Sequence, residues 1–580
     1  MVERTFGWVQ DPEDLQKLRR AVDVFCPGSA VHAEVCGTVA KLIATKDNRT
    51  GLLQAMARRP LRLSYRELVG SSFKPRYTAR CNGIMQAAIK GQKRPFIGDW
   101  PADNFVRWAH ALGFVEWCGA DDCFQITAAG KSLSRTKAGS EREYEVFAHG
   151  LLSYPPAVRV IGLLADAAQT KAGGMTKFEI GRRLGFQGEM GFTTISQNFY
   201  IKEYSLAQSA DERSKMRANW EGSADKYARM ICSWLSRLKH PWVRAEKHEL
   251  TGETGGEKHV CELRVYALTA KGFEERKKIT GASSSRRIAK RLPAEMLCTK
   301  GPGRMLLRAR RARVAAVILK HSATAGDIAA ILQKEGIAAS PGAVESDLRG
   351  LENIGLVIDK TDGAYRCRDK ITGLDIPQKP AAHSASDDIR RMKEQCEEAL
   401  RFVPHDFLAL IQMAFNGQDN RMFEIKIAEL LTEYCRFHGR HLGGANQPDA
   451  VISDGEVGAV IDAKSYSKGF NIPAPERDKM SRYLTDIKTR PESNKTLWWL
   501  HFPGTVRRFL FLFVSGKFGG NFRKQLKTLG THADTKGGAV TAMSLLLFAE
   551  QIASGKMQRA EFLRRISILD EAKPDDAERH

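Results

Sequence analysis

The sequence lacks the long apolar runs that a membrane protein needs. No stretch approaches the roughly eighteen consecutive apolar residues from which a membrane-spanning helix is recognised. The N-terminal residues Met1–Phe6 also lack the apolar core of a secretory signal peptide. We therefore expect a cytoplasmic protein with no membrane partner.

Cysteine pairs at the spacing of a metal site are also missing. The 11 cysteines are scattered along the chain without a CxxC pair. Cys118 and Cys123 come closest, but no cluster of histidines completes a zinc site beside them. We expect reduced thiols, as is usual in a cytoplasm.

Acidic residues are too few to balance the basic ones. The chain of 580 residues has 90 Lys and Arg against 67 Asp and Glu, a net charge of +23. Such a surplus indicates a polyanionic partner, and without a membrane signal that partner is expected to be nucleic acid. A chain of this length also exceeds what one hydrophobic core supports, so several domains are expected.

Three consecutive segments, 1–150, 151–285 and 286–370, share one plan of helices followed by a two-stranded hairpin. The third is the clearest, with predicted helices at 314–320, 328–335 and 344–354 before a hairpin. This plan is typical of a winged helix-turn-helix, and three copies in tandem favour extended contact with DNA. For the first segment, a helix capped by Gly113 in a generic α+β domain is the alternative. Any copy could instead serve as a protein-docking surface.

The second segment carries candidate base-reading residues. Thr176 is expected to cap one helix and Ser223 a later one over 224–238. Lys226 and Arg229 are three residues apart on that later helix, so both lie on one face, which suits readout of guanine in the major groove. A solvated basic face is the alternative. Short strands at 243–246 and 263–268 are expected to flank a glycine-rich wing.

Residues 371–400 form a predicted linker, and 401–580 a compact α/β domain. Its most apolar stretch, Phe509–Val514, is typical of a strand buried on both faces of a mixed sheet. Helices are expected near 420–433, 475–487, 538–554 and 558–572, and the first carries Glu424, a candidate extra carboxylate. Asp478 and Arg482 lie one turn apart on the second, as a surface ion pair would.

A hairpin in this last domain brings together the residues of a nuclease site. Asp454-Gly455 is a turn dipeptide between two β-prone runs. A turn centred there places Asp449 opposite Val460, one diagonal step from Asp462. Strand alternation puts Asp462 and Lys464 on one face and Ala463 on the other.

The pattern matches the PD-(D/E)xK signature of restriction-endonuclease-like nucleases. Asp449, Asp462 and the backbone carbonyl of Ala463 can hold Mg²⁺, which prefers oxygen ligands and keeps some waters. Lys464 would orient the attacking water or stabilise negative charge. An exposed hairpin with a surface Asp/Lys pair is the alternative to this reading.

Several longer sequence segments identify a family more specifically than this signature does. Together they resemble the FokI family of type IIS restriction endonucleases, nearly from end to end. The segments are TFGWVQ at 5–10, RWAHALGF at 107–114, SYPPA at 153–157, NWEGSADKYARMI at 219–231, HLGG at 441–444 and LFVSGKF at 512–518.

The resemblance implies an enzyme of the bacterial cytoplasm. Three helix-turn-helix-like recognition subdomains would precede a Mg²⁺-dependent cleavage domain, which is held against them until DNA binds and then pairs with a second cleavage domain. Such enzymes bind an asymmetric double-stranded site, cut both strands at a fixed distance downstream and leave 5′ overhangs. A companion DNA methyltransferase is expected, since the host genome needs protection.

The resemblance also implies roles for particular residues. Asp449, Asp462 and Lys464 would be catalytic, and Asp478 and Arg482 a dimerisation contact. The positions expected to contact DNA are Gln10, Arg76, Gln92, Trp100, Lys226 and Arg229.

The chain departs from the family pattern at one recognition position. Where that pattern has two asparagines before the tryptophan, this chain has Ala218-Asn219. Alanine cannot make the bidentate amide contact to adenine. The family target GGATG is therefore expected at its guanines, and the adenine position stays open.

Two other functions fit part of the pattern. Tandem winged helices with an inactive nuclease remnant would make a DNA-binding regulator, but the complete Asp/Asp/Lys set argues against it. A structure-selective nuclease such as a junction resolvase would not need three sequence-reading subdomains. We therefore expect a site-specific endonuclease.

Overall fold

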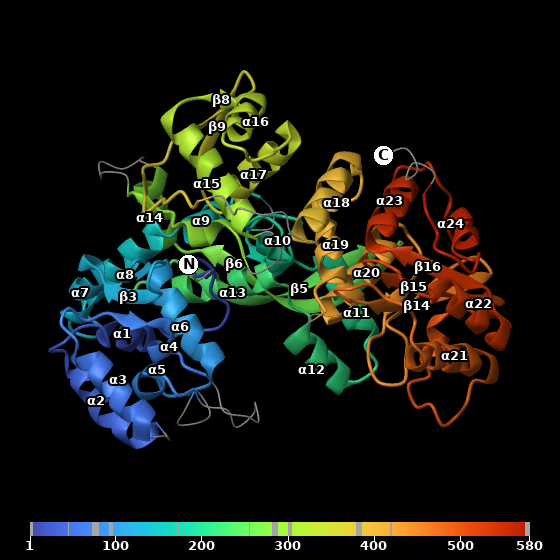
Figure 1. The fold of residues 1–580 in the computed structure, drawn as a ribbon, viewed down its shortest axis with the longest axis horizontal. Coiled ribbons are helices and arrows are strands. Elements are labelled where there is room, and N and C mark those ends of the chain that lie inside the picture. Colours follow the sequence, from blue (N-terminus) through green and yellow to red (C-terminus); the bar gives the residue numbers. More distant parts are fainter. Residues whose placement is uncertain are drawn as a thin grey trace.

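The computed structural model describes residues 4–43, 46–71, 81–91, 97–170, 173–254, 256–280, 288–299, 304–378, 385–417 and 420–574. Figure 1 shows residues up to 378 at the left and centre, and residues from 385 onward as a second lobe at the right. No helix in the described ranges combines the length and apolarity that a bilayer span requires.

The first segment is mainly helical and ends in a small antiparallel sheet. Its elements are α1 Leu15–Asp23, α2 Ala30–Leu42, α3 Lys46–Ala57, β1 Leu63–Ser64, α4 Tyr65–Leu68, α5 Met85–Ala88, α6 Asp99–Ala111, β2 Val115–Cys118, β3 Cys123–Ile126 and α7 Ala128–Ser134. After α6, Gly113 adopts a φ of +76° and the chain enters the hairpin β2–β3. The sheet order is β1-β3-β2. The helix that ends at a glycine therefore leads directly into a winged hairpin.

The second segment has a much longer wing. Its elements are α8 Glu141–Ser153, α9 Pro155–Ala167, β4 Met175–Thr176, α10 Lys177–Gly181, the 3₁₀ turn η2 Met190–Phe192, α11 Gln197–Leu206, α12 Ala210–Asn219, α13 Ser223–Ser236, β5 Val243–Thr254, β6 Glu257–Leu268 and α14 Ala270–Thr280. β5 and β6 pair without a break from Val243↔Leu268 to Thr254↔Glu257. The strands predicted at 243–246 and 263–268 are confirmed, and both extend further, so that the wing is one long ribbon. Gly256, with a φ of +85°, directly precedes β6, and the polar residues of both strands stay paired as far as Thr254↔Glu257.

The two predicted helix caps of this segment have different outcomes. Thr176 caps α10, as predicted, with Glu179 completing a capping box. The prediction for Ser223 is wrong, because Ser223 is already the first residue of α13 and Gly222 is the cap. The Asp225 carboxylate accepts the Gly222 N–H at 2.8 Å, so the helix starts one residue earlier than predicted.

The third segment is a winged helix, as predicted. Its elements are β7 Lys290–Arg291, η3 Ala294–Leu297, α15 Arg304–Lys320, β8 Ala323–Thr324, α16 Ala325–Lys334, α17 Pro341–Asn353, β9 Ile358–Thr361, β10 Ala364–Cys367 and β11 Ile371–Thr372. Thr324 and Ser340 cap α16 and α17 through their hydroxyls. The wing sheet has the order β8-β10-β9.

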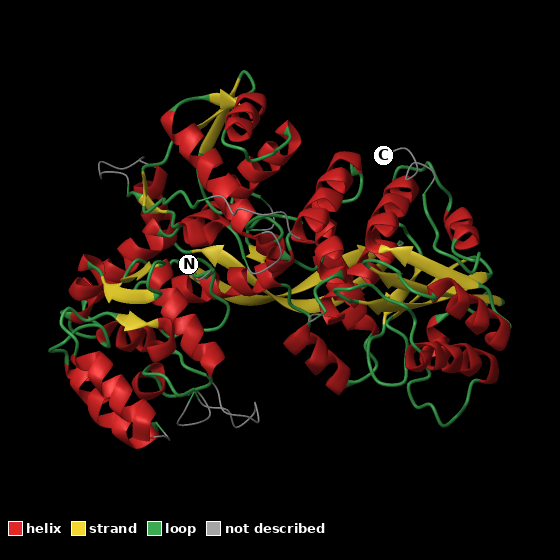
Figure 2. Cartoon of the chain, in the orientation of Figure 1, coloured by secondary structure: helices red, strands yellow, loops and turns green. Residues whose placement is uncertain are grey.

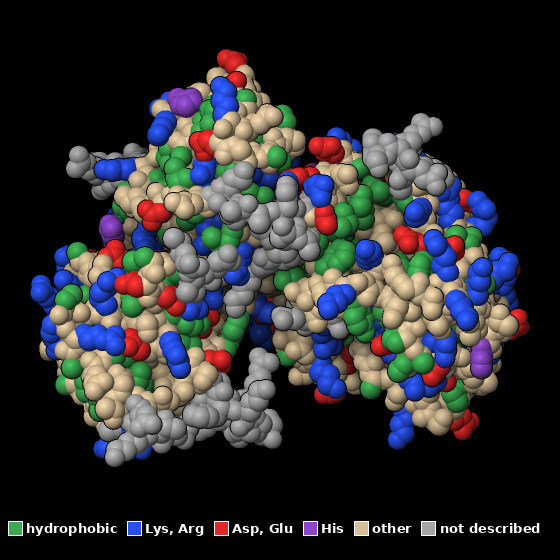
Figure 3. Space-filling view, in the orientation of Figure 1, with side chains coloured by type: hydrophobic (Ala, Val, Ile, Leu, Met, Phe, Trp, Pro, Cys, Tyr) green, Lys and Arg blue, Asp and Glu red, His purple; other side chains and the backbone are tan. Residues whose placement is uncertain are grey.

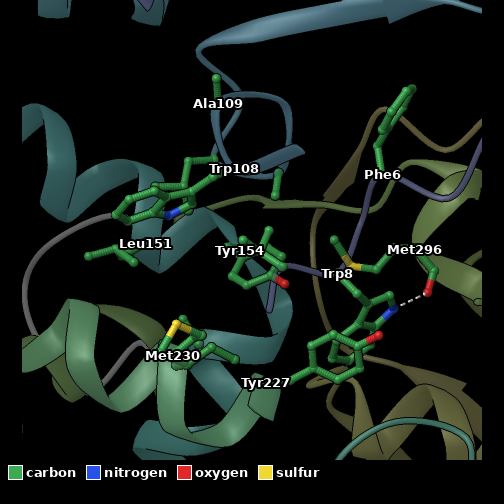
Figure 4. Packing of buried hydrophobic residues seen from close by; sticks show 14 of the residues in the cluster. Phe6, Trp8, Trp108, Ala109, Leu151, Tyr154, Tyr227, Met230 and Met296 are labelled. Atoms are coloured by element: carbon green, nitrogen blue, oxygen red, sulfur yellow. Dashed lines mark hydrogen bonds between the residues drawn. The ribbon is translucent and has the colours of Figure 1, made fainter. Parts of the chain in front are cut away.

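One hydrophobic core joins the three segments. It runs from Phe6 to Cys367 and includes side chains of all three. Figure 4 shows its centre, where the Trp8 indole donates a hydrogen bond to the Met296 carbonyl at 2.9 Å and packs beside Tyr227. The N-terminal segment around Trp8 thus connects the third segment to the second.

The C-terminal domain is a five-stranded mixed sheet between helices (Figure 2). Its elements are α18 Ala385–Ala399, η4 His405–Leu408, α19 Ala409–Ala414, α20 Asn420–Glu429, the π-helical turn η5 Leu430–Tyr434, β12 His438–His441, β13 Ala450–Asp454, β14 Val457–Lys464, α21 Ala474–Thr489, η6 Trp498–His501, β15 Arg508–Ser515, α22 Phe522–Ala533, β16 Gly537–Thr541, α23 Ala542–Ala553 and α24 Arg559–Arg565. In the order β12-β13-β14-β15-β16, the first three strands are antiparallel and the last three parallel.

Strand alternation sorts the side chains of this sheet between two cores. Ile452 and Ile461 pack with α19, α20 and α23, whereas Val451 and Val460 pack with α21 and α22. The buried strand predicted at 509–514 is β15, as expected. The helix predicted from 538 is wrong at its start, because 537–541 form the edge strand β16 and Thr541 then caps α23.

The C-terminal domain packs closely on the second segment. A second hydrophobic core joins Phe199 and Trp220 to residues of η4, α19 and α20. Polar contacts that cross the same boundary are Arg182 to the Tyr434 hydroxyl at 3.1 Å, Lys426 to the Thr194 carbonyl at 3.2 Å, the Ser196 N–H to Glu429 at 3.1 Å, and Arg440 to Glu203 at 3.3 Å.

Candidate active site and DNA-contact residues

The hairpin β13–β14 sets the spacing of the two candidate carboxylates. Its register is Asp454↔Val457, so the turn is Gly455-Glu456 and Gly455 takes the left-handed φ of +57°. Asp449 precedes the pair Ala450↔Ile461 and therefore lies opposite Asp462. The predicted partner, Val460, is wrong. Glycine is favoured at the first central position of a two-residue turn, which moves the turn one residue along the chain.

Asp449 and Asp462 form a buried pair on the α21 side of the sheet. Asp449 is 8% exposed and Asp462 1%. The Ala463 N–H donates to Asp449 at 2.7 Å, which orients this carboxylate towards β14. Burial raises the pKa of Asp449 well above its usual range, and the charges of Asp462 and Glu424 raise it further. Two carboxylates this close favour a bound cation.

Lys464 lies between two carboxylates. Its ammonium is 2.7 Å from Asp462 and 2.6 Å from Glu476 of α21. Burial lowers the pKa of Lys464, but Asp462 and Glu476 outweigh that effect and the net shift is upward. Lys464 is therefore a firmly charged group beside the carboxylates, as the nuclease signature requires.

Two residues of α21 at this site were not predicted. Glu476 holds Lys464, and Lys479 reaches Asp462 with its ammonium at 3.2 Å. Both lie in the first two turns of α21, whose N-terminal end lies over the end of β14. A signal existed in the sequence, since Glu476 and Lys479 are three residues apart and share one helix face, but nothing local placed that face over the hairpin.

The donor set fits a hard divalent cation. Asp449 and Asp462 supply carboxylate oxygens, and Ala463 follows Asp462 on the strand with a backbone carbonyl available as a third oxygen donor. Within the described ranges no group of three or more His, Cys, Asp or Glu side chains could hold a metal. Few protein ligands and several waters are what Mg²⁺ accepts.

Glu424 lies at the margin of this site. Its carboxylate is 3.8 Å from the His441 ring nitrogen, and its charge contributes to the raised pKa of Asp449. His441 in turn packs edge-on against Trp220 of the second segment, with ring centroids 4.9 Å apart. Trp220 of the second segment is thus separated from the carboxylate pair Asp449 and Asp462 by only two side chains, His441 and Glu424.

Four candidate DNA-contact residues lie in the described part of the chain. The Gln10 N–H donates to Asn104 at 3.1 Å, and Asn104 in turn donates to the carbonyl of Trp100, whose side chain is 46% exposed. Lys226 and Arg229 share one face of α13 and are partly exposed. Gln10, Asn104 and Trp100 therefore form one group. Arg76 and Gln92 lie outside the described residues.

Arg229 has an acidic partner, Glu221, that its position in the sequence did not predict. Glu221 lies 2.8 Å from Arg229 and 2.8 Å from Lys177. Burial raises the pKa of Glu221, but the two basic groups outweigh it and the net shift is downward. Glu221 orients Arg229 in the free protein. Ala218 and Asn219, the departure from the family pattern, end α12 and are exposed.

Asp478 and Arg482 do not pair with each other among the described residues. Asp478 is 72% exposed in its side chain and lies 3.7 Å from Arg477, and the Arg482 guanidinium lies 5.9 Å from the Tyr483 ring centroid. The predicted surface ion pair is therefore wrong, since α21 gives each residue a different neighbour. Both residues are on the face of α21 away from the sheet.

Comparison with known proteins covers almost the whole chain. Residues 4–136, 143–284 and 297–363 match the models of FokI recognition subdomain 1, recognition subdomain 2 and the D3 domain, and residues 386–572 match the FokI cleavage domain. The chain is 34% identical to the type II restriction enzyme FokI of Planomicrobium okeanokoites, over 97% of this chain and 98% of the relative. It is 29% identical to the type II restriction enzyme StsI of Streptococcus sanguinis, over 97% and 95%.

Solved structures give the same result. The structure of restriction endonuclease FokI matches with a TM-score of 0.86 over 99% of this chain and 100% of that one, at 34% identity. The structure of FokI bound to DNA matches with a TM-score of 0.87 over 98% and 100%, also at 34% identity.

Proposed function

This chain belongs to the FokI family of type II restriction enzymes, and from that membership we propose that it cuts both strands of DNA at a fixed distance from a short asymmetric site. It is a site-specific deoxyribonuclease that acts on double-stranded DNA and uses a divalent metal. The observation that carries the proposal is the convergence of Asp449, Asp462 and Lys464 at one end of the β13–β14 hairpin, within a chain that also has the three recognition subdomains.

Asp449, Asp462 and the Ala463 carbonyl would hold the metal, which we propose to be Mg²⁺ because all the donors are hard oxygens. When bound, Mg²⁺ supplies a water of lowered pKa and offsets charge on the phosphate. The Ala463 N–H keeps the Asp449 carboxylate oriented. Lys464, held by Glu476, places a positive charge where the phosphate gains negative charge.

Base recognition is assigned to Gln10, Arg76, Gln92, Trp100, Lys226 and Arg229. Lys226 and Arg229 would read guanine, since their donors match its O6 and N7 acceptors. The support is that both share the exposed face of α13 and that Glu221 already orients Arg229. We propose a target related to GGATG that keeps the guanines. The adenine position remains open because Ala218 cannot form the amide contact.

Cleavage on this proposal needs release and pairing of the last domain. The ionic and apolar contacts with recognition subdomain 2 support a resting state in which the cleavage domain is held. Asp478 and Arg482, without a mutual ion pair, are free to meet the same residues of a second copy across a two-fold axis. We propose a transient homodimer of cleavage domains on DNA, and cuts that leave 5′ overhangs.

The proposed functional units are 1–150, 151–285 and 286–370 for recognition, 371–400 as linker and 401–580 for cleavage.

The enzyme is assigned to the bacterial cytoplasm, where its DNA substrate lies and where its 11 free cysteines stay reduced. A companion methyltransferase would protect the host copy of the target.

Digestion of a plasmid of known sequence, with Mg²⁺ and with EDTA, tests the proposal. We expect discrete Mg²⁺-dependent fragments whose ends, read by run-off sequencing, lie at a constant offset from one shared motif. The motif also identifies the base opposite the Ala218 position. A smear would show cleavage without a site, and specific DNA binding without cutting would show a regulator.

A further inference from the structure

Helix α21 presents a second lysine to the carboxylate that we assign to the metal. Asp462 is 1% exposed, and each of its oxygens faces an ammonium group. Lys464 lies 2.7 Å from Oδ2, and Lys479 lies 3.2 Å from Oδ1. Two lysines thus lie against one buried carboxylate.

The two lysines differ in their other partners. Lys464 also contacts Glu476 at 2.6 Å, so it keeps a carboxylate partner when Asp462 binds something else. Lys479 has Asp462 as its ion-pair partner in the described part of the chain, and its ammonium lies 5.6 Å from the Tyr483 ring. Its side chain is 31% exposed, against 10% for Lys464. Lys479 is therefore the more accessible of the two lysines.

A cation at Asp462 would repel Lys479. Two positive charges a few ångströms apart in a partly buried site repel each other more strongly than they would in water. Lys479 can respond, because a lysine side chain is long and flexible and its head already borders solvent. A phosphodiester brought to the same carboxylate carries the negative charge that the displaced ammonium needs.

We propose that Lys479 is a second phosphate-binding lysine of the nuclease site, held in reserve by Asp462 until that carboxylate binds metal. The inference rests on the proposed function and deepens it. Lys479 then has two opposing effects. It competes with the metal for Asp462 in the free enzyme, and it binds a non-bridging oxygen of the DNA phosphate during cleavage.

The position of Lys479 on α21 has a second consequence. The neighbouring residue, Asp478, points to solvent. One side of α21 therefore faces the carboxylates, and another side carries the proposed contact with a second cleavage domain. A variant at Lys479 must therefore be examined for dimerisation as well as for chemistry.

The test compares the full-length wild type with Lys479→Ala, Lys479→Arg and the control Lys488→Ala. Lys488 lies on the same helix, but its ammonium donates to the Ala533 carbonyl, away from Asp462. Mn²⁺ binding without DNA is measured by electron paramagnetic resonance, with Asp462→Ala as the background for other sites. Single-turnover cleavage at saturating Mg²⁺ is measured at several enzyme concentrations.

We expect Lys479→Ala to bind Mn²⁺ about 3- to 10-fold more tightly, since a competing positive charge is gone. Its cleavage rate should fall about 10- to 100-fold at every enzyme concentration, with Lys479→Arg retaining most activity. A merely structural role would not tighten metal binding. Lys488→Ala should match the wild type in both measurements.

Unchanged Mn²⁺ affinity in Lys479→Ala, an unchanged cleavage rate, or a loss that high enzyme concentration restores would each overturn the proposal. If Lys479→Ala melts at a lower temperature than the wild type, Lys479→Gln replaces it, since glutamine keeps the polarity of the position without the charge. If the wild type itself fails to cleave, the proposed function fails, and the Mn²⁺ comparison still reports whether Lys479 competes at Asp462.

Discussion

At the scale of single residues, the Asp462 carboxylate has charged neighbours of both signs. It is almost fully buried, lies opposite Asp449 across the hairpin and contacts Lys464 and Lys479. A buried carboxylate is costly unless it is paired, so these contacts explain how it persists at the end of an apolar strand. The two carboxylates, Asp449 and Asp462, also repel each other, and a bound metal ion would relieve that repulsion.

Replacement of Asp462 by alanine should separate binding from cleavage. We expect Asp462→Ala to bind target DNA as the wild type does and to cleave at least about 10³-fold more slowly, because the proposed metal ligand is lost. Gel-shift titration in Ca²⁺ and cleavage in Mg²⁺ measure the two properties. Asp388→Ala, which removes an exposed aspartate of α18, is the matched control. Cleavage by Asp462→Ala at the wild-type rate would refute the assignment.

At the scale of elements, the β5–β6 ribbon links the recognition and cleavage parts. Its strands have 12 residues each, and near its tip the Thr254 hydroxyl donates to Glu433 of η5 at 3.3 Å. Burial raises the pKa of Glu433 to about 6, with Lys202 opposing the shift and Glu429 adding to it. The Glu433 carboxyl therefore binds its proton more tightly in the folded protein, where it is buried, than in a form where it is exposed.

The raised pKa of Glu433 makes the stability of the packed form dependent on pH. The stabilisation is complete below the ordinary carboxyl pKa and is lost as pH rises through about 6, because the buried carboxyl then ionises. Glu433→Gln removes the charge, so we expect it to raise the melting temperature at pH 7.5 by about 2–4 °C and to have little effect at pH 5. Calorimetry at both pH values measures this. Glu456→Gln, in the exposed turn of β13–β14, is the control, and equal shifts at both pH values would contradict the explanation.

At the scale of the whole molecule, charge and hydrophobic packing have different roles. Lys and Arg side chains are scattered over both lobes on the face shown in Figure 3, and the net charge of +23 favours association with DNA. Part of the basic content is internal, however, since Arg310 and Arg311 pair with Asp347 in the third segment at 2.6 and 2.8 Å. The apolar core shared with recognition subdomain 2 holds the cleavage domain in place.

The proposed pairing of two cleavage domains through α21 predicts the outcome of a charge-swap experiment. Asp478→Arg and Arg482→Asp should each cleave at least about 10-fold more slowly than the wild type, because like charges meet across the two-fold axis. An equimolar mixture should recover activity, since each altered residue then faces an opposite charge. Cleavage rates per enzyme, measured at several concentrations, check this. Full activity of either variant alone would exclude these residues from the interface.

The sequence by itself determined the parts that depend on near neighbours. Thr176 caps a helix where the sequence predicted it, and the apolar run at 509–514 is a buried strand. The Asp449, Asp462 and Lys464 set was also visible, because strand alternation places residues two apart on one face. Such features follow from the period and the capping chemistry of short stretches.

The tertiary structure decided what depends on contacts between distant residues. The turn at Gly455-Glu456 moved the hairpin register and set Asp449 opposite Asp462. The packing of α21 on the sheet brought Glu476 and Lys479 to the carboxylates. Neither result follows from local periodicity, because a helix pattern tells which residues share a face but not which strand end that face will cover. That choice is made when the cores on the two sides of the sheet are packed.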